Sequence, residues 1–261
     1  MVLVWLGAER DAERRERLGL AAKGERGKPT RQAPTPDTPS WQVRAEEAVD
    51  AGAYQLVGKV EHIVAAHIQE IPENGPDAAH VGSVHRGFVI AALSEYAEHD
   101  WAFTWTPGDT PETSHTALVG MKLGLRVLGV PIESLMVRAH VTQMGPALVQ
   151  EYLYLPLNMG EIYFASSVTP IAPLKQRYTH AMWCSPNLPR FVAKTILRAL
   201  MSQVNRDVPI WNNKTFRSAP PYSRVDVNVK RFRAWYAAFY SPHSESFADA
   251  MQREREAVLE W

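Results

Sequence analysis

Residues 134–155 and 160–171 read SLMVRAHVTQMGPALVQEYLYL and GEIYFASSVTPI. Both runs are rich in β-branched and aromatic residues and are punctuated by glycine and proline, a pattern typical of β-strands and turns. Two similar runs precede them, DWAFTWTP at 100–107 and HTALVGMKLGLRVL at 115–128. Because four or five strands follow one another without an intervening helix, the sequence predicts an antiparallel sheet.

Helical patterns lie on both sides of this predicted sheet. Residues 190–208, RFVAKTILRALMSQVNRDV, predict a long amphipathic helix that ends at Pro209. Its apolar face is expected to contain Phe191, Val192, Ile196, Leu200 and Val204. Residues 229–240, VKRFRAWYAAFY, give a last helical pattern. The order helix, antiparallel sheet, long helix is that of an α+β fold.

The region upstream of the sheet is more ambiguous. From Tyr54 to Lys59 the pattern is compatible with a strand, but apolar positions then recur at helical spacing over residues 60–71. Those positions are Val60, Ile63, Val64, His67, Ile68 and Ile71. Pro76 is suited to the first turn of a further helix.

Composition divides the chain into four segments. Residues 1–7 contain an apolar strand pattern, VLVWL, and residues 8–40 are charged and then rich in Pro and Thr. Because residues 8–40 contain few large apolar side chains, we expect them to form a disordered insertion. Residues 41–243 have the composition of a globular domain, and residues 244–261 form a charged tail that we expect to be helical.

The bulk composition narrows the possible functions. The 261 residues carry 28 basic and 28 acidic side chains, which gives no general reason to expect nucleic acid as a partner. No window contains the ~18 apolar residues that a membrane-spanning helix requires. Cys184 is the sole cysteine, so this sequence cannot form an internal disulfide or a cluster that needs two cysteines. A single cysteine favours a reducing, intracellular location.

Residues 67–85, HIQEIPENGPDAAHVGSVH, concentrate groups that can bind metals. Two imidazoles and one carboxylate can hold ferrous iron or zinc and leave coordination positions open. His80 and His85 are five residues apart, which is about 140° around a regular helix. They can therefore share a metal only where the helix ends or is distorted, for which Gly82 is suited. The spacing alone equally fits polar residues on an exposed helix face.

The whole string is more specific. EIPENGPDAAHVGSVH resembles the iron-binding signature N-x2-D-x2-H-x4-H of the Rieske-type non-heme iron oxygenases, with Asn74, Asp77, His80 and His85 at its four named positions. HIQEIPENG, VTQMGPALVQEYL, DVPIWNNKTF and KRFRAWYAAFY resemble one branch of that family. This branch contains the cholesterol 7-desaturases (Neverland type) and the 3-ketosteroid 9α-hydroxylases, and the likeness covers roughly residues 41–240.

The resemblance implies roles for individual residues. It implies that Asp207, in RDVPIW, is the third metal ligand beside His80 and His85, although relatives usually carry an acidic residue where this chain has Arg206. Asp77 is implied to accept a hydrogen bond from a metal-bound histidine and to bridge to a cluster ligand of a neighbouring subunit. Asn74 is expected either near the iron or as a helix cap. We expect structural roles for two further histidines, His62 and His67.

The resemblance also implies a fold and cofactors. The fold is a helix-grip (START/Bet v 1-like) domain, an antiparallel sheet curved over a long C-terminal helix with an apolar cavity between them. Candidate cavity aromatics are Trp101, Phe103, Trp105, Tyr152, Tyr154 and Phe164. The implied cofactors are mononuclear Fe(II), a [2Fe-2S] Rieske cluster and NAD(P)H acting through an electron-transfer reductase. The implied co-substrate is O2, and the implied assembly is a homotrimer.

The Rieske cluster needs two cysteines and two histidines, and this sequence contains only one cysteine. We therefore expect the cluster on a missing domain, with residues 1–7 as the strand left from its junction, or on a partner chain. A chain of this kind would be soluble and inactive alone, and any membrane anchor of full-length relatives would lie in a missing N-terminal segment.

Three functions follow from these observations. The first is the catalytic domain of a sterol oxygenase, with C7–C8 desaturation of cholesterol favoured because PIWNNK is closer to that branch. The second is a steroid hydroxylase of the 3-ketosteroid 9α-hydroxylase type. The third is a non-catalytic sterol-binding module, which would have no evident use for the five motif residues. Iron content distinguishes the third from the other two.

Overall fold

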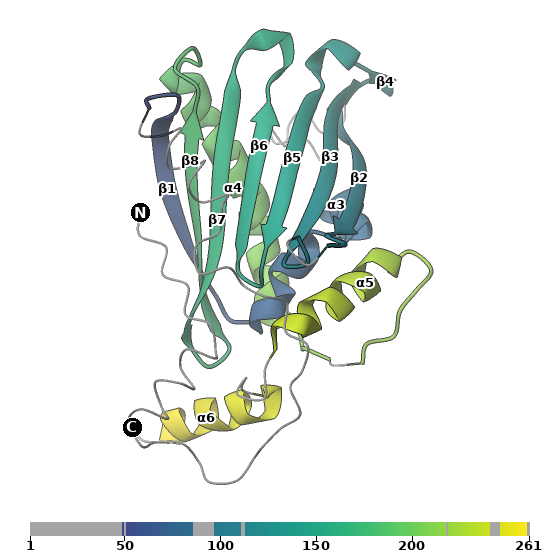
Figure 1. Cartoon of the computed structure of the whole chain (residues 1–261), viewed down its shortest axis with the longest axis vertical. Coiled ribbons are helices and arrows are strands. Elements are labelled where there is room, and N and C mark those ends of the chain that lie inside the picture. Colours follow the sequence, from purple (N-terminus) through teal and green to yellow (C-terminus); the bar gives the residue numbers. More distant parts are fainter. Residues whose placement is uncertain are drawn as a thin grey trace.

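The computed structural model describes residues 49, 51–85, 97–110, 113–217, 219–240 and 246–259. The strand expected at 1–7 and the insertion expected at 8–40 lie outside these residues. The described chain contains an eight-stranded sheet in the order β1-β8-β7-β6-β5-β3-β2, with the short β4 beside β3 (Figure 1). The strands are β1 Gln55–Val64, β2 Ala97–Pro107, β3 Thr116–Val127, β4 Val130–Pro131, β5 Val137–Met144, β6 Leu148–Tyr154, β7 Glu161–Ala172 and β8 Lys175–Cys184.

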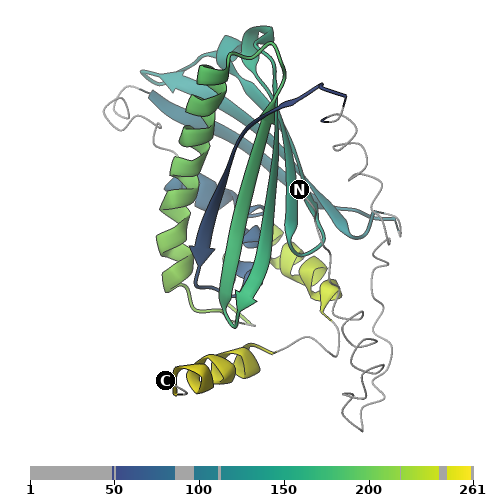
Figure 2. The same ribbon diagram turned by 90° about the vertical axis from the view of Figure 1, so that its left-hand side faces the viewer.

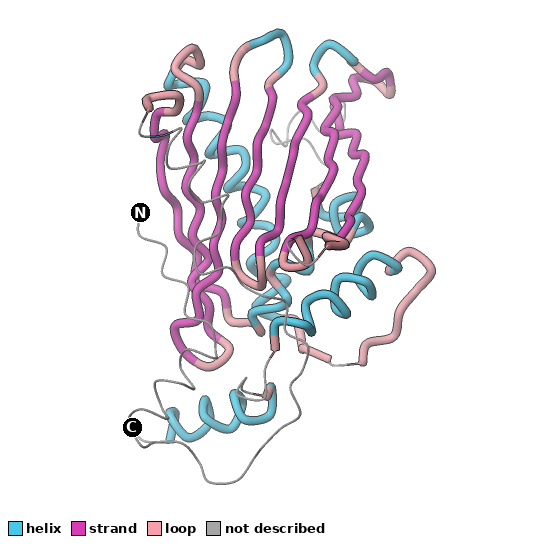
Figure 3. Tube along the Cα trace, in the orientation of Figure 1, coloured by secondary structure: helices cyan, strands magenta, loops and turns pink. Residues whose placement is uncertain are grey.

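Every strand pairing in this sheet is antiparallel. Strands β5 to β8 form a meander, and β1 joins the sheet beside β8, far from β2, its neighbour in chain order. The described α-helices are α3 Ala78–Val84, α4 Arg190–Asn213, α5 Val227–Tyr236 and α6 Phe247–Leu259 (Figure 3). Short 3-10 turns join several elements. The predicted α+β fold with an antiparallel sheet and a long helix is confirmed.

Helix α4 runs along one face of the sheet (Figures 1 and 2). Its buried Leu197 and Met201 belong to the main hydrophobic cluster, together with inward side chains of the sheet such as Phe164 and Met182. Each such burial stabilises the fold by about 1.5–3 kcal/mol. The helix approaches β1 closely, because a Cβ added at Gly58 would lie 3.0 Å from Cδ2 of Leu197. Glycine at this position lets the helix pack directly on the edge strand.

Helix α4 differs from its prediction in two respects. Phe191 is 75% exposed, and the buried residues are Ala193, Leu197, Met201, Asp207 and Trp211, so the fully buried stripe lies beside the predicted one. Pro209 lies inside the helix, which continues to Asn213. A proline interrupts one backbone hydrogen bond at a cost of about 3 kcal/mol. The burial of Trp211, 2% exposed in the cluster that contains Val64, offsets this cost.

The helical prediction for residues 60–71 is wrong. Residues up to Val64 belong to β1, whose burial alternates, with Ile63 47% exposed and Val64 fully buried. Pairing with β8, in which Val60 faces His180, outweighs the local helical spacing. A 3-10 turn, η1 (Ile68–Glu70), replaces the rest of the predicted helix. Pro76 precedes α3 rather than lying in its first turn. No described helix is long and apolar enough to cross a lipid bilayer.

Candidate metal centre

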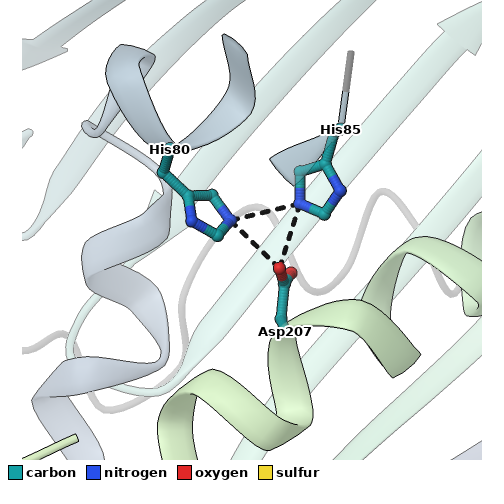
Figure 4. Close-up of side chains that lie close together, drawn as sticks. All are labelled: His80, His85 and Asp207. Atoms are coloured by element: carbon teal, nitrogen blue, oxygen red, sulfur yellow. Dashed lines mark hydrogen bonds and ion pairs between the residues drawn. The ribbon is translucent and has the colours of Figure 1, made fainter. Parts of the chain in front are cut away.

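Helix α3, the residue that follows it and helix α4 bring three of the predicted site residues to one point (Figure 4). The Nε2 atoms of His80 and His85 are 3.1 Å apart. Each of these nitrogens also lies 3.1 Å from Oδ1 of Asp207. The three side chains are nearly buried, with about one tenth of their surface exposed. Two histidines and a carboxylate therefore form a triangle of donor atoms that can hold a metal ion.

The local structure explains how residues five apart can share this point. Helix α3 ends at Val84, so His85 follows its last residue and is free of the helical periodicity that separates it from His80. The start of the helix is fixed by Asp77, whose Oδ1 accepts a hydrogen bond of 2.9 Å from the backbone N–H of His80. Asp77 is therefore the helix cap. No distortion at Gly82 is required, because the helix runs through it.

The donor set fits a metal ion. A metal bound about 2.1 Å from three donors at right angles places those donors about 3.0 Å from one another, which matches the observed triangle. Oδ1 of Asp207 is buried, and Nε2 of His80 and Nε2 of His85 each lie 3.1 Å from it. Burial alone would raise the pKa of Asp207, but the neighbouring imidazoles of His80 and His85 outweigh it and lower the pKa below its usual value. The carboxylate is therefore ionised, as a metal ligand must be.

Asn74 lies at the edge of this triangle. Its Nδ2 is 3.1 Å from Nε2 of His80. Of the two positions expected for Asn74, beside the metal site or at a helix cap, the structure gives the first. The 3-10 turn η2 (Pro72–Asn74) delivers this side chain to the site.

The sequence analysis missed a residue that supports the site, Gln203. Nδ1 of His85 lies 2.9 Å from Oε1 of Gln203, so the imidazole donates a hydrogen bond and leaves the lone pair of Nε2 directed at the metal site. Arg206 donates to the same Oε1 at 3.2 Å and to the backbone oxygen of Val84 at 3.5 Å. Gln203 is one helical turn before Asp207. A polar residue on this mostly apolar helix face was the signal that could have found it.

Buried ion pairs anchor the turn that precedes the site. Arg233 of α5 donates to both oxygens of Glu73, at 2.6 and 2.8 Å, and Lys214 lies 3.3 Å from the same carboxylate. Lys214 also pairs with Glu70, whose pKa is raised by burial. Glu70 and Glu73 are 1% and 6% exposed. These contacts tie the residues immediately before Asn74 to the end of α4 and to α5.

The two further histidines named in the sequence analysis, and the described aromatic side chains, lie outside the triangle of donor atoms. His62 lies 3.0 Å from Oδ1 of Asn205, and His67 accepts a hydrogen bond from the N–H of Gln69 and stacks on Phe216. Among the aromatics proposed for a cavity, Trp105 and Phe164 are buried in the core, Tyr152 is half-buried and Tyr154 is 41% exposed. The side chains of Trp101 and Phe103 lie outside the described part of the structure.

The fold and the site together define an α+β domain with a metal-binding group of two histidines and one aspartate. The chain belongs to the family of the 3-ketosteroid 9alpha-hydroxylase C-terminal domain, whose profile matches residues 25–240. This match confirms the family resemblance inferred from the sequence motifs.

The relatives come from both named groups. The chain is 36% identical over 231 residues to the cholesterol 7-desaturase nvd of Bombyx mori, covering 85% of this chain and 48% of the relative. It is 33% identical over 232 residues to that of Hemicentrotus pulcherrimus, with coverages of 85% and 48%. It is 23% identical over 223 residues to a probable 3-ketosteroid-9-alpha-monooxygenase oxygenase component of Rhodococcus rhodochrous, with coverages of 82% and 51%. The chain thus spans about half the length of these curated relatives.

A solved structure shows the same fold. The crystal structure of dicamba monooxygenase bound to dicamba superposes with a TM-score of 0.55 and 14% sequence identity. The superposition covers 79% of this chain and 63% of that one.

Proposed function

We propose that this chain is the catalytic part of an O2-dependent sterol oxidoreductase in which His80, His85 and Asp207 bind one Fe(II) ion. The observation that carries the proposal is the triangle of three donor atoms 3.1 Å apart in a member of this family. Two histidines and one carboxylate with open positions are typical of mononuclear iron oxygenases. When bound, ferrous iron supplies the activation of O2 that oxidation of an unactivated C–H bond requires.

The residues around the site have separate tasks in this proposal. Gln203 holds His85 in the tautomer whose Nε2 faces the metal, through the bond to Nδ1. Asp77 fixes the start of α3 and therefore the position of His80. In the assembled enzyme, Asp77 also accepts a hydrogen bond from a metal-bound histidine and connects it to a neighbouring subunit. Asn74 stands beside His80 and restricts access to the site from that side.

The favoured reaction is desaturation of cholesterol between C7 and C8. The names of the relatives at 36% and 33% identity support this substrate. The reaction consumes O2, two electrons and two protons and releases two molecules of water. A second candidate is 9α-hydroxylation of a 3-ketosteroid, which the family description and the Rhodococcus rhodochrous relative support. The third candidate is a sterol-binding module without catalysis. The meeting of His80, His85 and Asp207 at one point argues against this candidate, because sterol binding alone does not require metal ligands.

The proposal includes components beyond these residues. Electrons come from NAD(P)H through a reductase and a [2Fe-2S] Rieske cluster, which another part of the polypeptide or a partner carries. The working assembly is a homotrimer in which the cluster of one subunit faces the iron of the next. The domain is of the helix-grip type, with the sheet curved over α4, and the enzyme acts inside the cell.

Product analysis tests the reaction. Hydrogen peroxide can replace O2 and two electrons, so the Fe(II)-loaded chain with cholesterol and peroxide is expected to form 7-dehydrocholesterol, detected by mass spectrometry. The Asp207→Ala variant should form none. A 9α-hydroxylated product from a 3-ketosteroid, with cholesterol unchanged, would favour the second candidate. Sterol binding by a protein that retains no iron would overturn the catalytic proposal.

A further inference from the structure

Glu151 occupies an unusual place for a carboxylate, at the centre of β6 on the face that α4 covers. Side chains alternate along a strand, so Glu151 shares its face with Val149 and Leu153, which both pack in the main hydrophobic cluster. Its cross-strand neighbours are Val141 on β5 and Phe164 on β7, both buried in the same cluster. The carboxyl group therefore projects into an apolar row of the sheet's inner face.

No hydrogen bond or ion pair reaches the Glu151 carboxyl from the residues that the structure describes. The side chain is half-buried rather than fully enclosed, and its apolar surroundings raise its pKa to about 7. Glu70 and Glu73, by contrast, meet Lys214 and Arg233. An unpaired carboxyl in an apolar environment destabilises a fold, and such groups gather at binding and catalytic sites. Glu151 thus lacks the structural partners that explain the other two glutamates.

Glu151 lies on the same side of the sheet as the metal centre. Burial and the nearby charges of Glu151 and, more weakly, Asp207 raise the pKa of Tyr178, an inward residue of β8. The phenol is therefore within electrostatic reach of both carboxylates. Apolar side chains of the sheet and of α4, among them Val149 and Leu200, pack against the core while keeping part of their surface exposed. These side chains offer contact surface to an apolar molecule on the face of the sheet that α4 covers.

We propose that Glu151 binds the hydroxyl group of a sterol substrate whose ring system contacts the neighbouring apolar side chains. This inference rests on the proposed function and specifies how the substrate is oriented. A sterol is apolar apart from one hydroxyl group at the end of its ring system, which matches one polar group in an apolar row. A carboxyl group can bind a hydroxyl in either protonation state, because a hydroxyl both donates and accepts. A ketone only accepts, so the site favours a hydroxylated sterol over a 3-ketosteroid.

The test compares the affinities of the chain for cholesterol and for cholest-5-ene, which lacks only the hydroxyl. Each affinity is measured by displacement of radiolabelled cholesterol. The wild type is expected to bind cholesterol at least about tenfold more tightly, since the analogue leaves the carboxyl unpaired. Glu151→Leu should abolish this preference, and Glu151→Gln should keep part of it. Glu133→Gln, an exposed carboxylate in the turn before β5, is the matched control and should keep the full preference.

The outcomes separate the inference from the proposed function. Equal binding of the two sterols by the wild type, or an unchanged preference in Glu151→Leu, would overturn the role of Glu151 alone. Binding of neither sterol would overturn the proposed sterol substrate as well. Thermal unfolding identifies misfolded variants. Because leucine suits the apolar neighbours Val141 and Phe164 better than a carboxyl group does, Glu151→Leu should melt at or above the wild-type temperature.

Discussion

Replacing Gln203 with leucine should weaken metal binding although Gln203 is not itself a ligand. The amide accepts a 2.9 Å hydrogen bond from Nδ1 of His85, and His85 is 8% exposed, so water can replace the lost partner only poorly. Loss of such a supporting bond typically lowers metal affinity about 10- to 100-fold, or about 1.4–2.8 kcal/mol. Burial places the expected effect of Gln203→Leu in the upper part of this range. Anaerobic titration with Fe(II), or with Co(II) as a spectroscopic substitute, measures it.

Two further variants make this result specific. Gln203→Glu keeps an acceptor oxygen for His85 and should bind the metal at least as tightly as the wild type. Ser202→Ala removes a hydroxyl that donates to the backbone oxygen of Ala199 and should leave the affinity unchanged. Equal dissociation constants for Gln203→Leu and the wild type, with both proteins folded, would refute the argument that Gln203 orients His85.

Three more predictions concern stability and the approach to the site. Arg233→Met leaves Glu73 buried without its two-bond partner and should lower the free energy of unfolding in urea by about 3 kcal/mol; a change below about 1 kcal/mol would contradict this. Burial, with a smaller contribution from a neighbouring histidine, lowers the pKa of His180 from 6.5 to about 3, so the unfolded state binds the extra proton. The contribution of neutral His180 to the free energy of unfolding is complete above pH 6.5. It is lost at about 1.4 kcal/mol per pH unit as the pH falls towards 3, and His180→Gln should reduce this slope. In Gly75→Ala, the new Cβ would clash with Nε2 of Gln143, which donates to the backbone oxygen of Pro72 and so holds the turn before Asn74. Iron titration should show several-fold weaker binding. An unchanged affinity would exclude a link between this turn and the metal site.

The sequence predicted the parts of the fold that local patterns determine. Alternating runs bounded by glycine and proline indicated the strands of the central sheet, and helical spacing indicated α4. Residues 60–64 were misassigned because their spacing fits a helix, whereas pairing with β8 decides their conformation. Pro209 was read as a helix end because the burial of Trp211, which compensates for it, depends on β1 and β7. In both cases a contact distant in sequence outweighed the local signal.

The site shows the same division. The motif named Asn74, Asp77, His80, His85 and Asp207, and the structure brings the three candidate ligands together at one point. The motif could not reveal Gln203, because its contact with His85 joins two segments 118 residues apart. Glu151 was also hidden, because in sequence it is one polar residue of an ordinary alternating strand. Its isolation becomes visible only when strands β5 and β7 are placed beside it.

The central claim is that His80, His85 and Asp207 hold one metal ion, and anaerobic Fe(II) titration tests it most directly. The wild-type chain should retain one ferrous ion per chain after desalting, while His80→Ala, His85→Ala and Asp207→Ala should each retain almost none although they remain folded. His62→Ala, which removes a histidine outside the triangle, should retain as much iron as the wild type. Full iron retention by Asp207→Ala and by both ligand-histidine variants would contradict the account.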